Sequence, residues 1–138
     1  MIPHQATSIA IGGRALLIEG PPGSGKSSLA LALIDRGAVL IGDDSVLLET
    51  QQGRLVAHPH PNTRGLLELR NLGLITLPVC EAAPVAVVLL LDKGAPRHVE
   101  GPEQAERGGV AVPMLRLWPA SPILHLKAEL ALERFGLG

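Results

Sequence analysis

The chain has 138 residues, 46% of them hydrophobic, which predicts one globular domain spanning residues 1–138 with a packed core. A net charge of −1, one Phe, one Trp and no Tyr exclude the basic surface and stacking aromatics of a nucleic-acid-binding protein. The lone Cys80 cannot form an internal disulfide, and the longest apolar run, residues 84–91, is too short to span a membrane. No signal peptide is evident. We therefore expect a cytoplasmic protein with no nucleic-acid or membrane partner.

The first elements are predicted to form a β-hairpin. Residues 6–11 have the alternation of a strand, and residues 14–19 form a second apolar run of strand length. Gly12-Gly13 between them offers a two-residue turn of the type that joins antiparallel strands. The chain is therefore expected to open with two paired strands.

Residues 20–27 match the phosphate-binding P-loop motif G-x-x-x-x-G-K-[ST] without a mismatch. Because a strand precedes the motif and a helix follows it, backbone N–H groups and the helix N-terminus converge on one anion. Lys26 can reach the β- and γ-phosphates of a nucleoside triphosphate, and the Ser27 hydroxyl can ligate Mg²⁺. The expected nucleotide-binding residues are Gly20, Pro21, Pro22, Gly23, Ser24, Gly25, Lys26, Ser27 and Ser28.

The segment after the motif is predicted to be a helix over residues 28–36, buried rather than amphipathic because its apolar residues lie on every side. A strand over residues 38–41 then ends at Gly42-Asp43-Asp44. Ligands collect at the carboxyl ends of strands in α/β sheets, so the two carboxylates would lie beside the phosphates. One could contact the proton of the nucleophile and the other a metal, although on spacing alone a polar turn explains them equally well.

The middle of the chain is predicted to contain a second hairpin, turning at Gln51-Gln52-Gly53. Residues 58–62 contain two prolines and are expected to be a connector without regular structure. We interpret His58 and His60 as exposed loop residues, because no third metal ligand lies at a suitable spacing. The strands predicted in this part of the chain are residues 46–49, 54–57, 65–69 and 72–77.

The second half begins with a continuous aliphatic run at residues 85–91, predicted to be a central strand covered on both faces. Residues 92–109 are expected to be a polar loop with a short helix at 103–106, and residues 110–117 the last strand. A helix over residues 122–135 ends the chain. These elements predict an α/β fold in which a mixed sheet carries a buried P-loop helix and a C-terminal helix.

Several segments together carry a family resemblance. The P-loop is followed by Leu29-Ala30-Leu31, Arg36-Gly37, Leu40-Ile41-Gly42-Asp43-Asp44 and Glu68-Leu69-Arg70-Asn71-Leu72-Gly73. Ile11-Gly12-Gly13-Arg14 precedes them, and Val110-Ala111-Val112-Pro113 follows. This order resembles the catalytic domain of HPr kinase/phosphorylase, in the short bacterial version that lacks the separate N-terminal domain, over about residues 4–133.

The resemblance implies an ATP- and Mg²⁺-dependent serine kinase that phosphorylates HPr, the phosphocarrier protein of the sugar/nitrogen phosphotransferase system. It implies that Asp43 is the general base and that Glu68 binds magnesium together with Ser27. Lys26 would neutralise charge on the migrating phosphoryl group, with Asp44 as a supporting carboxylate and Arg70 as a supporting or phosphate-facing cation. Since members of the family form hexamers, a homo-oligomer is implied as well.

The sequence also departs from the family pattern. Gln5 stands where the family has a functional histidine before the P-loop, and His4 is one residue away. Either a small backbone adjustment brings His4 into that role, or the role is absent. Residues 77–84 and 117–122 have no counterpart of the basic segments with which longer members contact HPr and release phosphate. Arg97 is the nearest remaining cation. These departures favour the kinase reaction over the phosphorylase reaction.

Two alternative functions fit the P-loop itself: a small-molecule kinase and a non-catalytic ATP-binding regulator. Small-molecule kinases usually need an arginine-rich lid and a substrate-binding insertion, for which 138 residues leave little room. A regulator that only binds ATP needs neither Asp43 nor Glu68, so the presence of both favours a catalyst.

Overall fold

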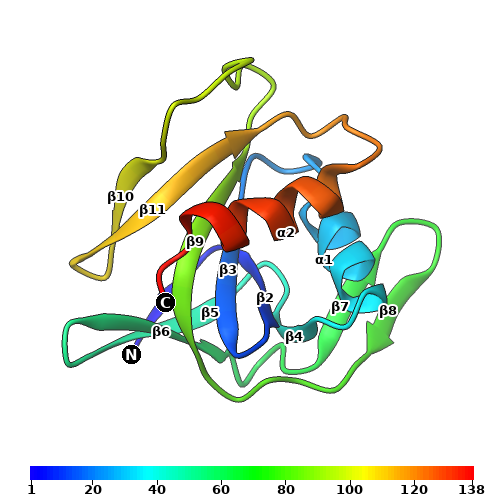
Figure 1. The fold of residues 1–138 in the computed structure, drawn as a ribbon. Coiled ribbons are helices and arrows are strands. Elements are labelled where there is room, and N and C mark those ends of the chain that lie inside the picture. The colour runs from blue at the N-terminus through cyan, green and yellow to red at the C-terminus, as the bar shows by residue number, and fades with distance from the viewer.

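A nine-stranded mixed sheet organises the computed structural model, which describes residues 1–138 (Figure 1). Its main path runs through β1 (Ile2–His4), β5 (Val46–Gln51), β6 (Arg54–Pro59), β9 (Ala83–Leu91), β3 (Arg14–Glu19), β2 (Thr7–Ile11) and β4 (Val39–Gly42). The remaining elements are β11 (Val110–Leu117) on β9, β10 (Glu103–Arg107) on β11, the hairpin of β7 (Leu66–Leu69) and β8 (Gly73–Thr76), and the helices α1 (Lys26–Asp35) and α2 (Leu124–Phe135). The α/β architecture predicted from the sequence is confirmed, and neither helix is long and apolar enough to cross a membrane.

The strand β9 is the centre of this sheet, as its aliphatic run predicts. It pairs in parallel with β3 on one side. On its other side the first residues pair antiparallel with β6 and the last four pair in parallel with β11, so the sheet branches there. The register against β3 shifts between Ala15 and Leu16, and the extra residue in β9 turns both Ala86 and Val87 toward the helices.

The two faces of the sheet bury two separate cores. On one face α1 packs against β2 and β4, α2 packs against β9 and β11, and the two helices contact each other (Figure 1). Leu33 and Leu132 of these helices lie with Leu16 and Leu89 in this core. On the other face the hairpins β5–β6 and β10–β11 fold over the sheet, and their side chains enclose Leu17 and the rest of the second core. Every residue of α1 from 29 to 34 is buried or half-buried, which confirms the prediction of a buried helix.

The predicted helix at residues 103–106 is wrong, because this segment is the strand β10. Gly108 (φ 54°) and Gly109 (φ 77°) form the two-residue turn that pairs β10 with β11, and Ala105 is buried in the second core. The same positive dihedrals at Gly12 (56°) and Gly13 (81°) join β2 to β3, where the turn was predicted correctly.

The predicted connector at residues 58–62 begins later than expected. His58 and Pro59 belong to β6 and pair with Leu47 and Val46 of β5. A proline is tolerated there because Pro59 ends the strand, and β9 pairs only with the earlier residues Val56 and Ala57 of β6. His58 is therefore a half-buried strand residue, bonded to Glu49 at 2.9 Å, rather than an exposed loop residue.

Three further boundaries differ from the prediction. The short edge strand β1 was not expected from the sequence. The helix α1 starts at Lys26, two residues earlier than predicted, and α2 starts at Leu124, two residues later. The segments predicted as strands at residues 65–69 and 72–77 form the hairpin β7–β8, which packs Leu67 and Leu69 against the helix-side core.

Candidate functional site

The glycine-rich loop, residues 20–25, leaves the end of β3 and enters α1. A Cβ at Gly20 would lie 2.7 Å from Ser24 Oγ and 3.1 Å from the Leu91 carbonyl oxygen, so this position has room only for glycine. Gly23 (φ 78°) and Gly25 (φ 97°) have left-handed backbone conformations, and Gly25 is the N-cap of α1. The loop thus turns directly onto the N-terminus of the helix.

Several hydrogen-bond donors at this loop are available to bind an anion. Lys26 Nζ donates to the carbonyl oxygens of Gly20 (2.9 Å) and Pro21 (3.2 Å), and it has no carboxylate partner. The Ser24 hydroxyl is buried without any hydrogen-bond partner. The first turn of α1 contains no acidic residue that would offset the positive end of the helix dipole. These features fit a phosphate chain.

A carboxylate lies at the end of the loop, where the sequence predicts it. Asp43 Oδ1 accepts hydrogen bonds from Ser27 Oγ at 2.7 Å and from Thr7 Oγ1 at 3.0 Å. Asp43 Oδ2 accepts the backbone N–H of Glu68 at 3.0 Å. Three elements, β2, α1 and β7, therefore hold this one carboxylate in place. We call Ser27, Asp43 and Glu68 the acidic flank of the loop.

The strand β7 places two predicted site residues near the loop. Its alternation buries Leu67 and Leu69 and leaves Glu68 and Arg70 exposed. A Cβ added at Gly23 would lie 3.3 Å from Arg70 Nη2, so the Arg70 guanidinium lies against the loop. The structure thus brings Ser27, Asp43, Glu68 and Arg70 together around the start of α1.

Asp44 is positioned differently from Asp43. It is exposed and has a left-handed backbone (φ 65°), a conformation that aspartate tolerates better than most residues. Its N–H donates to Thr7 Oγ1 at 3.2 Å, while its carboxylate makes no hydrogen bond or ion pair. Thr7 is fully buried and contacts both aspartates, so it links their two positions.

His4 does not bond to the acidic flank. Its Nε2 lies 2.7 Å from Glu19 Oε2, and Arg107 donates two hydrogen bonds of 2.7 and 3.0 Å to the same carboxylate. Burial alone would raise the pKa of Glu19, but the bonds from His4 and Arg107 outweigh it and lower the pKa to about 2. Because Glu19 immediately precedes Gly20, this cluster anchors the start of the loop to β1 and β10.

Sequence reasoning missed both Glu19 and Arg107. The available signal for Glu19 was a single carboxylate at the end of an otherwise apolar strand, directly before the P-loop. Arg107 comes from the strand that was predicted to be a loop, 88 residues from its partner, and no local pattern connects the two.

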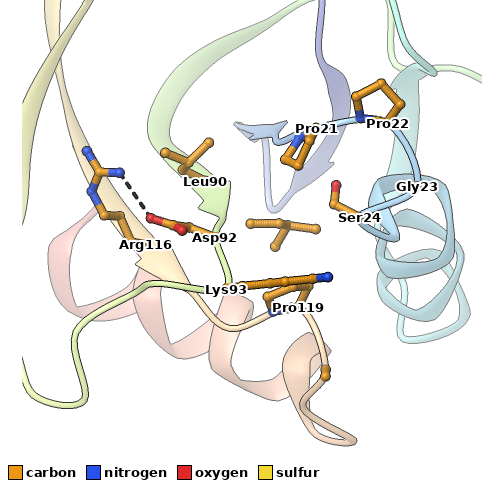
Figure 2. Close-up of a pocket in the computed structure, with 11 residues that line it drawn as sticks. Pro21, Pro22, Gly23, Ser24, Leu90, Asp92, Lys93, Arg116 and Pro119 are labelled. Carbon is orange, nitrogen blue, oxygen red and sulfur yellow. Dashed lines mark hydrogen bonds and ion pairs between the residues drawn. The ribbon is translucent and has the colours of Figure 1, made fainter.

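A cavity of about 880 Å³ opens beside the loop (Figure 2). It is lined by loop residues 21–24, by residues 90–93 at and after the end of β9, by Arg116, and by residues 119–120. Arg116 is bound to Asp92 at 3.2 Å and to Glu103 at 2.7 Å. We call Lys93, Arg116 and residues 119–120 the cavity flank of the loop; the sequence pointed to none of them. Arg97, the cation considered instead, is exposed and does not line the cavity.

Comparison with known proteins relates this arrangement to one family. Residues 3–80, more than half of the chain, match the family model of the HPr Serine kinase C-terminal domain. A protein of Clostridium tetani named HPr kinase/phosphorylase is 44% identical over 66 residues, which are 48% of this chain and 22% of that protein. One of the same name from Mycoplasma mycoides is 34% identical over 74 residues, 54% of this chain and 24% of that protein. The matches thus span about a quarter or less of these relatives' length.

A solved structure resembles the whole fold. The Hpr(Ser) kinase/phosphatase from Coxiella burnetii superimposes with a TM-score of 0.86 and 25% sequence identity, covering 96% of this chain and 95% of that one. The match includes the second half of the chain, which the family model does not reach. By its sequence match and its fold, the chain belongs to the HPr serine kinase C-terminal domain family.

Proposed function

We propose that this chain is an ATP- and Mg²⁺-dependent protein serine kinase that phosphorylates an HPr-like phosphocarrier protein in the cytoplasm, with residues 1–138 as one kinase domain. The observation that carries the proposal is the acidic flank, where Asp43 is bonded to Ser27 and to the backbone of Glu68 at the end of the glycine-rich loop. Membership of the HPr serine kinase family supports the same reaction class.

The loop would bind the phosphates and neutralise their charge. When the nucleotide binds, Lys26 would exchange its hydrogen bonds to the carbonyl oxygens of Gly20 and Pro21 for hydrogen bonds to the phosphates. Ser24 Oγ would donate a hydrogen bond to a phosphate oxygen. Magnesium, held by Ser27 and Glu68, would supply further charge neutralisation on the phosphates during transfer. Arg70, which lies against Gly23, is the second cation available to the migrating group.

Asp43 is proposed as the general base, and its bonding leaves room for that role. An ionised carboxylate has about four acceptor positions. Oδ1 uses two of them on Ser27 and Thr7, and Oδ2 uses one on the Glu68 N–H, so Oδ2 keeps one for an incoming hydroxyl. The Ser27 hydroxyl can keep its hydrogen on Asp43 while an oxygen lone pair faces the metal.

The transfer then needs no group beyond these. Asp43 takes the proton of the acceptor serine while the serine oxygen forms a bond to the γ-phosphorus. In the same step, the bond between that phosphorus and the β–γ bridging oxygen breaks. ADP leaves, and the proton passes from Asp43 to water. We propose that Asp44 is a supporting carboxylate beside Asp43, linked to it through Thr7, and that His4 acts through Glu19 on the position of the loop.

The forward direction is proposed because cations for the reverse reaction are scarce. Residues 77–84 and 117–122 contain no basic residue. In the structure, residues 119–120 line the cavity, and Trp118 donates its indole N–H to the Ala95 carbonyl oxygen at 2.6 Å.

The decisive experiment is incubation of the protein with γ-labelled ATP, Mg²⁺ and the HPr of the same organism. Acid-stable seryl phosphate on HPr is the expected result. Asp43→Asn should abolish the labelling, whereas Asp35→Asn, an exposed aspartate at the far end of α1, should leave it unchanged. Label on a metabolite but not on HPr would show a small-molecule kinase, and ATP binding without any transfer would show a regulator; either result contradicts the proposal.

A further inference from the structure

The cavity beside the loop has no part in the transfer step proposed above. Loop residues 21–24 form one wall, and none of the acidic-flank residues lines it. Its volume of about 880 Å³ lies within the range of pockets that bind small molecules, about 300–1,000 Å³. The cavity is therefore large enough to hold more of a ligand than its phosphates.

The walls of the cavity are mainly apolar. Pro21, Leu90 and Pro119 are among the residues that line it (Figure 2), and no aromatic side chain does. Polar groups are few, among them the buried Ser24 hydroxyl that has no hydrogen-bond partner. Apolar walls with a few polar groups are typical of sites that bind a small organic molecule.

The two cations of the cavity differ in what they can still bind. Arg116 is occupied by Asp92 and Glu103, whose two negative charges exceed its single positive charge, so it has none left for a ligand. Lys93 has no carboxylate within ion-pair distance. Its side chain extends across the cavity, with the ammonium group toward loop residues Gly23 and Ser24 (Figure 2). Lys93 therefore brings an uncompensated charge to the side of the phosphate loop.

We propose that this cavity binds the base and ribose of the nucleoside triphosphate, and that Lys93 binds the phosphate chain where it leaves the loop. The inference rests on the proposed function, since it takes the phosphates to lie in the glycine-rich loop. It adds a nucleoside site built from β9, β11 and residues 119–120, and a lysine outside the P-loop motif that contributes to phosphate binding.

Two probes separate the two halves of this proposal. Calorimetry in the presence of Mg²⁺ would measure the affinities of ATP and of tripolyphosphate, which lacks the nucleoside. Lys93→Met should lower the affinity for both probes by about tenfold or more, because a charge-assisted contact to phosphate is lost. Ala120→Phe places a ring at the exposed edge of the cavity. This substitution should lower the affinity for ATP by about tenfold and leave the affinity for tripolyphosphate within about twofold of the wild-type value.

Lys127→Met is the matched control, because Lys127 on α2 has no ion pair and does not line the cavity. A Lys93→Met protein that binds both probes as well as Lys127→Met does would overturn the role of the lysine. An Ala120→Phe protein with unchanged ATP affinity, or with equal loss for both probes, would overturn the nucleoside site. An Ala120→Phe protein that binds ATP normally but phosphorylates the carrier protein poorly would also overturn the nucleoside site, since the cavity would then hold the acceptor.

Failure of the proposed function would look different. In that case the wild-type protein and both variants would show the expected binding pattern, while no phosphate would reach the phosphocarrier protein. Binding and transfer are thus tested by separate measurements.

Discussion

The two flanks of the glycine-rich loop are built in different ways. In the acidic flank, hydrogen bonds from Thr7, Ser27 and the Glu68 backbone fix one carboxylate. In the cavity flank, Lys93 is free of ion pairs and faces a large, mainly apolar space. The family match over residues 3–80 contains the whole acidic flank and none of the cavity flank. The groups proposed for transfer thus come from the first half of the chain, and the second half shapes the cavity proposed to hold the nucleoside.

The strongest way to break this comparison is to neutralise Asp43. Asp43→Asn should lower the rate of phosphoryl transfer by about 10²–10⁴-fold, because the acceptor hydroxyl loses its base. ATP affinity should stay within about threefold, since the cavity flank is untouched. Single-turnover kinetics and calorimetry measure the two quantities. A variant with unchanged turnover would refute the role assigned to Asp43.

Lys26→Ala should affect both flanks, because Lys26 is proposed to bind the phosphates that join them. We expect ATP affinity to fall by about 10–100-fold and turnover to fall as well, through the loss of charge-assisted hydrogen bonds. The same measurements apply, with Lys127→Ala as the control for the loss of a lysine elsewhere. An affinity equal to that of the control would show that Lys26 does not contact the phosphates.

Glu19 tests how the loop is anchored. Its pKa of about 2 lies below its ordinary value of 4.5, so the ionised carboxylate stabilises the folded protein above pH 4.5 and this contribution is lost as the pH falls toward 2. Glu19→Gln should therefore lower the free energy of unfolding by about 3 kcal/mol at pH 7 but by only about 1 kcal/mol at pH 3.

Urea unfolding at the two pH values measures this difference. Glu133→Gln is the control, because Glu133 is exposed on α2 and has no ion pair. A loss of stability that is the same at both pH values would mean that the ionised form of Glu19 is not what stabilises the fold.

The smallest effect is expected at the turn of the β10–β11 hairpin. Gly109 has a positive φ, and a Cβ there would meet no atom within 4 Å, so Gly109→Ala introduces backbone strain alone. We expect thermal unfolding to show a loss of about 1 kcal/mol, and transfer to be unchanged because no hydrogen bond that holds Asp43 comes from this hairpin. Gly101→Ala, without a positive φ or a contact, should be neutral. Equal stability of the two variants would contradict the turn geometry.

The two glycine-pair hairpins show how much of the fold could be predicted. Gly12-Gly13 lies between two apolar runs, so the turn and both strands were recognised. Gly108-Gly109 has the same conformation, but Glu103-Gln104-Ala105-Glu106-Arg107 has only one apolar residue and was mistaken for a loop with a helical turn. What makes this segment a strand is its pairing with β11 and the burial of Ala105, which are tertiary contacts.

The candidate site divides in the same way. The order of P-loop, Asp43-Asp44 and Glu68-Leu69-Arg70, together with the family it resembles, predicted which residues gather at the acidic flank. The partner of His4 was not predictable, because Glu19 and Arg107 lie 15 and 103 residues from it and meet only where β1, β3 and β10 converge.

By itself, the sequence determined the glycine-rich loop, the buried helix behind it and the central strand β9, because glycine spacing and runs of aliphatic residues act over a few neighbouring positions. Only the tertiary structure decided that residues 90–93, Arg116 and residues 119–120 close a cavity against that loop. They meet because β9 pairs in parallel with both β3 and β11, which brings the ends of all three strands to the same edge of the sheet. No local pattern encodes that strand order.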